Sequence, residues 1–157
     1  MKKLLLSGLV VLGLALAQSP YVGGHVGLFG VSGVNIFNGG VHAGVGLQGG
    51  LEVRGGVDFS SLLGILITGV NADVLMNLSI PGSQVYPYAG LGGNLWLFPG
   101  GITSFGVHAT LGLKYPIAGV PFVAFLEAQP TYAFGGSAFG GSGAFVYYLK
   151  LGGNYSF

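Results

Sequence analysis

Residues 105–115, which read FGVHATLGLKY, decide the fold. Every second residue in this stretch is apolar, and the residues between are glycine or polar. The apolar positions are Phe105, Val107, Ala109, Leu111, Leu113 and Tyr115. Because side chains of a β-strand point alternately to its two faces, this period of two predicts a strand with one apolar and one polar face.

The same alternation recurs along the chain. In residues 70–80 apolar side chains alternate with asparagine, aspartate and serine, and in residues 41–48 with histidine, glycine and glutamine. Segments of about ten alternating residues separated by turns are typical of a transmembrane barrel, because lipid leaves no partner for an unpaired backbone group. Eight such segments are predicted: 20–30, 39–48, 50–60, 68–80, 85–98, 104–115, 121–133 and 143–157. We therefore expect an all-β fold, an eight-stranded antiparallel up-and-down transmembrane β-barrel.

The connections between these segments alternate in character. Turns near 48–50, 81–84 and 116–119 are tight, whereas connections 30–38, 61–67, 99–103 and 134–142 are longer or richer in glycine. In an outer-membrane barrel short turns face the periplasm and longer loops face outward. Residues 62–67 are more apolar than an outer loop should be, which leaves open a second interpretation in which two strands extend to a turn near Gly64.

The composition excludes two broad classes of protein. Only 6% of the 157 residues are charged and 51% are hydrophobic. A soluble domain has roughly a quarter of its residues charged, and a disordered chain combines low hydrophobicity with high net charge. There is no cysteine, which excludes a disulfide framework and a lipid anchor on cysteine. After residue 17 no uninterrupted apolar stretch is long enough for a membrane helix.

Residues 1–17 predict a cleaved secretory signal peptide, which leaves residues 18–157 as the barrel domain. Lys2 and Lys3 form a basic start, residues 4–14 are an apolar run, and residues 15–17 supply a small-residue cleavage pattern. A membrane anchor is the alternative, but the run is shorter than the about 20 residues that cross a bilayer. We expect a protein of the bacterial outer membrane with both termini in the periplasm.

All seven charged residues after the signal peptide fall on the polar faces of the expected strands. They are Glu52, Arg54, Asp58, Asp73, Lys114, Glu127 and Lys150. Since a lysine or arginine facing lipid costs about 2–4 kcal/mol at the midplane, we expect a polar network in the lumen. One interpretation is a gate that opens by exchange of partners; the favoured one is a satisfied polar core, because buried charge must be paired. Three bases give no footprint for nucleic acid.

Aromatic residues near the segment ends predict a girdle at each membrane interface. On the periplasmic side these are Tyr86, Tyr115, Phe122, Tyr155 and Phe157, and on the outer side Phe29, Phe59, Phe98, Phe105, Tyr132 and Phe145. Trp96, Phe125 and Tyr148 share the parity of the charged residues instead. We expect them to fill the interior opposite inward glycines.

Two stretches resemble the OmpA-like family of small eight-stranded outer-membrane barrels. Residues 86–94, YPYAGLGGN, look like the opening of the fifth strand in that family, and residues 149–157, LKLGGNYSF, resemble its C-terminal assembly signal. Four residues follow the pattern of that signal, namely Leu149, Leu151, Tyr155 and Phe157, whereas Gly153 departs from it. The resemblance implies two partners, the outer-membrane lipid and an Omp85-type assembly machinery. We expect the transmembrane barrel alone, without a peptidoglycan-binding domain.

The three histidines His25, His42 and His108 all have lumen parity. A lipid A modifying enzyme needs a nucleophile or base where lipid can reach it, and a metal site needs more ligands than His25 and His42 supply. We therefore expect no catalytic residue, no metal and no cofactor. The leading hypothesis is a monomeric, non-enzymatic outer-membrane protein with a structural role and outer loops available to surface partners. A narrow pore for small solutes is the alternative, and a lipid A modifying enzyme the second alternative.

Overall fold

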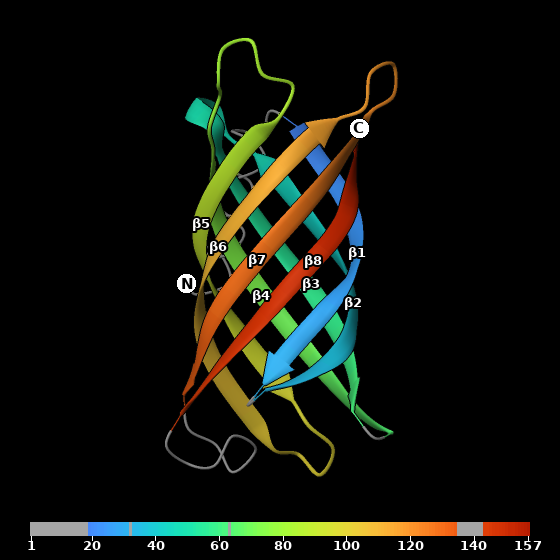
Figure 1. The fold of residues 1–157 in the computed structure, drawn as a ribbon, viewed down its shortest axis with the longest axis vertical. Helices are drawn as coiled ribbons and strands as arrows, with labels where there is room; N and C mark the ends of the chain where they lie inside the picture. The colour runs from blue at the N-terminus through green and yellow to red at the C-terminus, as the bar shows by residue number, and fades with distance from the viewer. Residues whose placement is uncertain (1–18, 32, 63, 135–142) are drawn as a thin grey trace, which may run out of the picture.

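A computed structural model describes residues 19–31, 33–62, 64–134 and 143–157, so the expected signal peptide lies outside the described residues. It shows a closed barrel in which each strand pairs antiparallel with its neighbour in sequence and β8 returns to β1 (Figure 1). The predicted fold class is confirmed. The strands are β1 (Ser19–Val31), β2 (Val34–Gly46), β3 (Leu51–Leu62), β4 (Ile65–Asn77), β5 (Tyr86–Leu97), β6 (Thr103–Pro116), β7 (Phe122–Phe134) and β8 (Ala144–Ser156).

Helical structure plays a minor part in the described chain, where one short 3₁₀ turn, Gln48–Gly50, connects β2 with β3. Within the described ranges no helix is long and apolar enough to cross a membrane.

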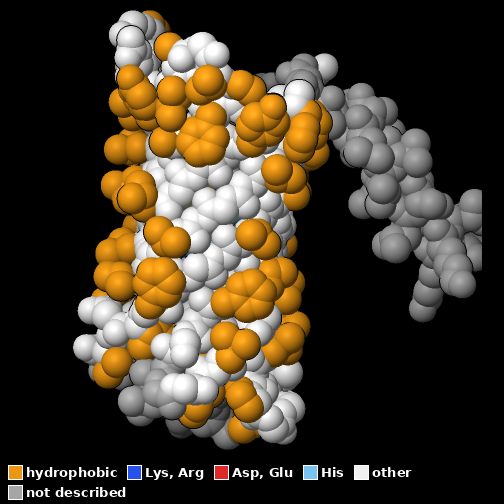
Figure 2. All heavy atoms as spheres, turned by 90° about the vertical axis from the view of Figure 1, so that its right-hand side faces the viewer, with side chains coloured by type: hydrophobic (Ala, Val, Ile, Leu, Met, Phe, Trp, Pro, Cys, Tyr) orange, Lys and Arg blue, Asp and Glu red, His pale blue; other side chains and the backbone are white. Residues whose placement is uncertain are grey.

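The alternation of each strand separates an apolar outside from a polar inside. In β6 the outward Leu111 is 57% exposed, whereas the inward His108 and Thr110 are buried. Figure 2 shows one outer face on which apolar side chains are numerous from one end to the other, with no charged side chain between them. This division places every charged residue and every histidine of the strands on the inward face, where a lipid chain cannot reach it.

The connections differ from the prediction at one end of the barrel. We call this end, where β1 meets β2 and β3 meets β4, the hairpin end, and the opposite end, where β1 begins and β8 ends, the terminal end. At the hairpin end Val31 pairs with Val34, and Leu62 pairs with Ile65. The predicted loops 30–38 and 61–67 are therefore wrong, and the alternative with a turn near Gly64 is correct.

A glycine explains both short turns. Gly33 and Gly64 have φ values of 82° and 81°, a left-handed conformation that glycine adopts without steric cost. Two-residue hairpins depend on such positions, so both strand pairs continue almost to their tips. The connection at 78–85 of the terminal end is longer than either of these turns, against the expectation of a tight turn at 81–84. Most of the connection between β7 and β8 lies outside the described residues.

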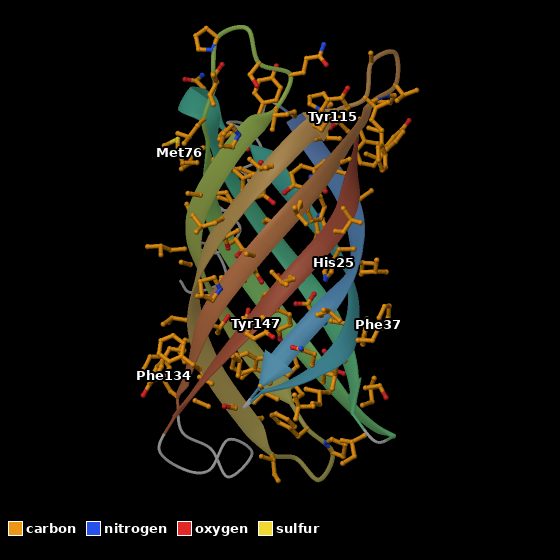
Figure 3. All side chains as sticks on the ribbon, in the orientation of Figure 1. His25, Phe37, Met76, Tyr115, Phe134 and Tyr147 are labelled. Carbon is orange, nitrogen blue, oxygen red and sulfur yellow. The ribbon has the colours of Figure 1, made fainter. Side chains whose placement is uncertain are left out.

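The outward aromatic side chains lie near the two ends, as Figure 3 shows for Phe37 and Phe134 at the hairpin end and Tyr115 at the terminal end. Phe29 was expected in this girdle, and that expectation is wrong. Its side chain points inward and is 1% exposed, because its ring stacks on Tyr148 with centroids 4.8 Å apart. Phe98 also packs against this inner cluster.

Inward glycines make room for large rings on neighbouring strands. A Cβ atom at Gly112 would lie 2.3 Å from Cζ of Tyr88, and one at Gly44 would lie 2.4 Å from the Tyr21 hydroxyl. At Gly106 it would lie 2.7 Å from the Trp96 ring. Side chains of β-strand neighbours therefore interdigitate inside the barrel with no space left at these glycines.

We expect Gly112→Val to lower the free energy of unfolding by about 1–3 kcal/mol, the cost typical of overpacking a filled interior. Urea unfolding of the protein in lipid vesicles measures it. Gly39→Val is the matched control, since its Cβ would have its nearest neighbour at 3.6 Å. Equal losses for the two variants would contradict the packing described here.

Candidate functional site: the barrel lumen

The lumen is closed at the hairpin end by an apolar plug. The Trp96 indole donates a hydrogen bond of 2.6 Å to the Tyr148 hydroxyl, on whose ring Phe29 stacks. The buried members of the plug are Phe29, Ile36, Ile67, Trp96, Ala133, Val146 and Tyr148. Trp96 and Tyr148 thus fill the interior as predicted, and Phe125 does so deeper in the barrel, where its ring meets His42 edge-on at 5.6 Å.

Arg54 holds the centre of the lumen. Its Nε lies 3.0 Å from Oδ2 of Asp73 on the neighbouring strand, and its Nη1 lies 2.8 Å from Oε2 of Glu127 across the barrel. The Tyr88 hydroxyl donates a second bond to the same Glu127 oxygen at 2.8 Å. One guanidinium therefore bridges two buried carboxylates from β4 and β7.

The second oxygen of Asp73 has its own partners. Nε2 of His108 lies 2.5 Å from Oδ1, and the Thr110 hydroxyl and the Gln129 amide donate to it at 3.3 and 3.4 Å. Asp73 and His108 are both almost completely buried. The carboxylate is thus surrounded by donors on β3, β6 and β7.

A second cluster surrounds Asp58, nearer the plug. Lys150 Nζ and Asn71 Nδ2 donate to Oδ2 at 3.1 and 2.9 Å. His25 Nε2 lies 2.9 Å from Oδ1 of Asp58 and 3.2 Å from Oδ1 of Asn38. His25 extends from β1 (Figure 3), whereas Asn71 comes from β4 and Lys150 from β8. This cluster therefore joins strands from opposite sides of the lumen.

A third cluster lies at the terminal end. Glu52 accepts hydrogen bonds from the Tyr21 hydroxyl at 2.5 Å and from Asn77 at 3.0 Å, and it forms an ion pair with Lys114. Lys114 also donates to Oδ1 of Asn77 at 2.8 Å. These groups line the base of a vestibule of about 420 Å³.

The structure places all seven charged residues in the lumen, in three clusters that stack along the barrel axis. Each base contacts at least one acid. An unfilled volume of about 210 Å³ remains between the Arg54 and Asp58 clusters, yet it is too narrow to hold a water molecule. The arrangement can hold charge in fixed pairs across the width of the lumen.

Uncharged partners complete these clusters, and the charge pattern alone missed them. They are Tyr21, Asn38, Asn71, Asn77, Tyr88, Thr110, Gln129 and Asn154. All share the inward parity of their strands, and that parity was the signal available in the sequence.

The side chains of all three histidines contact other side chains inside the lumen. His108 and His25 contact carboxylates, whereas His42 Nε2 lies 2.7 Å from Oδ1 of Asn154 and its ring stacks on His25 at 6.0 Å. In the part of the chain that the structure describes, no group of three or more histidine, aspartate or glutamate side chains is arranged to hold a metal ion.

Three residues of the expected assembly signal lie on the outward face of β8, and the fourth, Phe157, follows directly after this strand. Leu149, Leu151, Tyr155 and Phe157 are between 45% and 77% exposed. Gly153, which departs from the pattern, lies beneath the ring of Phe122, and a Cβ atom there would be 2.0 Å from that ring. A side chain from β7 thus fills the apolar position that β8 leaves open.

Comparison with known proteins identifies the fold. No family model and no curated protein matches the sequence. Among solved structures, Neisserial surface protein A superimposes with a TM-score of 0.71 at 16% identity, over 88% of this chain and 96% of that one. The chain has the fold of the small eight-stranded outer-membrane barrels. The OmpA-like resemblance is confirmed at this level.

Two further structures share this small-barrel fold at similar identity. The N-terminal β-barrel domain of Pseudomonas aeruginosa OprF gives a TM-score of 0.56 at 17% identity, over 87% of this chain and 97% of that one. A de novo designed transmembrane β-barrel gives 0.54 at 15% identity, over 90% and 97%. Natural and designed sequences of this small-barrel fold differ widely, so function has to be argued from the lumen and the surface of this chain.

We expect Arg54→Met to lower the free energy of unfolding by about 3–5 kcal/mol, because it leaves Asp73 and Glu127 buried without their shared cation. Urea unfolding in vesicles measures the loss. The triple variant Arg54→Met, Asp73→Asn, Glu127→Gln removes the unpaired charges as well and should recover much of it. An Arg54→Met protein as stable as the parent would show that the bridge contributes nothing.

Proposed function

We propose that this protein is an integral protein of the bacterial outer membrane with a structural, non-enzymatic role in the envelope. The observation that carries the proposal is the pairing of an uncharged apolar exterior with a lumen that is filled and charge-paired. An exterior of this kind is suited to lipid. A filled interior lets the barrel add a rigid, non-conducting element to the bilayer.

The lumen gives little support to the two alternatives. A pore needs a continuous aqueous path, whereas the plug and the Arg54 bridge obstruct the axis at two heights. A lipid-modifying enzyme needs a nucleophile or base that lipid can reach. The Ser60 hydroxyl instead accepts a hydrogen bond of 3.0 Å from Asn38 inside the barrel, and the Nε2 atoms of the histidines contact lumen residues.

The proposal includes the route to the membrane. Residues 1–17 direct export and are removed, and the terminal end of the barrel then faces the periplasm. An Omp85-type machinery inserts the chain after reading Phe157 together with Tyr155, Leu151 and Leu149. The inserted barrel acts as a monomer without a cofactor.

Three measurements test the structural role. We expect the protein to sediment with the outer membrane, and a deletion strain to become more sensitive to detergent. We also expect the refolded protein to give no stable current steps in planar bilayers, since the lumen is obstructed. Recovery from the inner membrane or the soluble fraction would contradict the location. Discrete steps would contradict the closed lumen and favour the narrow pore.

Phe157→Ser should slow insertion by the purified assembly machinery severalfold, because the terminal aromatic is lost. Phe145→Ser is a matched control: both residues lie on the chain's last segment, and Phe145 is 75% exposed against 77% for Phe157. Refolding into plain lipid vesicles should differ little between the variants. Equal rates with the assembly machinery would contradict the proposed recognition of Phe157.

A further inference from the structure

The β3–β4 hairpin continues beyond the closed part of the barrel. β2 pairs with β3 no further than Ser60, and β5 pairs with β4 no further than Thr68. Beyond these limits Ser61 pairs with Leu66, and Leu62 with Ile65. We call residues 61–62 and 64–66, on either side of the turn, the ribbon. In Figure 1 its green tip, at the lower right, flares outside the column formed by the other strands.

The ribbon carries large apolar side chains in an exposed position. Ile65 is 50% exposed and Leu66 is 54% exposed. Leu66 shares the outward parity of Val70 and Val74, which are 44% and 50% exposed, so the outer face of the ribbon continues the lipid-facing surface of β4. The ribbon has no charged residue. An isolated two-stranded hairpin is only marginally stable in water, and exposed aliphatic side chains make water a poor environment for this one.

The unpaired edges of the ribbon make the hydrocarbon core of the bilayer an unsuitable environment as well. Among the described residues neither edge pairs with a neighbouring strand, and hydrocarbon offers nothing for free backbone N–H and C=O groups. The boundary between headgroups and acyl chains suits both the backbone and the side chains of the ribbon. Water and lipid oxygens can form hydrogen bonds with the backbone groups at its edges, and acyl chains can cover its aliphatic side chains.

We infer that the ribbon is an interfacial anchor, which lies in the headgroup region of the leaflet at the hairpin end with Ile65 and Leu66 against lipid acyl chains. The inference rests on the proposed membrane location of the barrel. It assigns the ribbon to lipid and not to a soluble partner. An anchor on one side of the barrel fixes the depth of the hairpin end and the side toward which the barrel leans.

Single spin labels test this placement cleanly, because the chain has no native cysteine. Labels are attached to Ile65→Cys and Leu66→Cys in protein refolded into phosphatidylcholine vesicles. Power-saturation measurements then compare collisions with oxygen, which is enriched in lipid, and with a water-soluble nickel chelate. Ile80→Cys is the matched control, since Ile80 is 49% exposed on the connection at the terminal end. Leu111→Cys reports on the middle of the barrel wall.

We expect the labels at 65 and 66 to lose most of the nickel accessibility that the Ile80 label shows and to gain oxygen accessibility toward the Leu111 value. Nickel accessibility at 65 and 66 equal to that at Ile80 would overturn the anchor while a lipid-exposed Leu111 label leaves the membrane barrel standing. A water-exposed Leu111 label would overturn the membrane location itself. Spin–spin broadening of the Leu66 label that disappears on dilution with lipid would show that a second copy covers the ribbon, which also overturns the anchor.

Discussion

The pairing of β1 with β8 is the interaction on which the rest of the structure depends. It runs from Tyr21↔Ser156 to Val31↔Val146 and turns an open sheet into a closed wall. In lipid an open edge would leave a row of unpaired backbone groups, each of which costs several kcal/mol. Closure removes that cost, and it also creates an interior where charged side chains can be paired away from lipid.

The interior then has to satisfy the charges that the wall encloses. The chain meets this demand with contacts between residues far apart in sequence, such as Arg54 with Glu127 and Asp58 with Lys150. Such pairs hold opposite walls together, and breaking one partner leaves the other buried without compensation. The same closure that permits a polar core therefore makes its pairing obligatory. The inward glycines belong to this arrangement, because they admit the rings of Tyr21 and Tyr88 that donate to Glu52 and Glu127.

Local periodicity predicted most of the fold, because the contrast between lipid and lumen imposes one residue type on each face. It predicted the eight strands and the inward parity of Trp96 and Tyr148. It failed where the contrast is weak. β2 begins at Val34, five residues before its predicted start, since the glycine, serine and asparagine residues within 30–38 are typical of a loop. Partners across the lumen, such as Arg54 and Glu127, depend on how the strands are staggered around the barrel, which no single strand's pattern contains.

The ribbon lies where the chain is no longer placed between lipid on one face and the lumen on the other. Inside the barrel each strand has a partner on both sides, so outward side chains meet lipid and inward side chains meet the lumen. At Ser61 the pairing with the neighbouring strands ends, and Ile65, although it has inward parity, no longer lies against a lumen. Beyond this point β3 and β4 continue as an apolar hairpin whose outer edges have no neighbouring strand among the described residues. A bilayer interface is the environment that accepts both properties at once, so the ribbon extends the logic of the barrel wall into the headgroup layer.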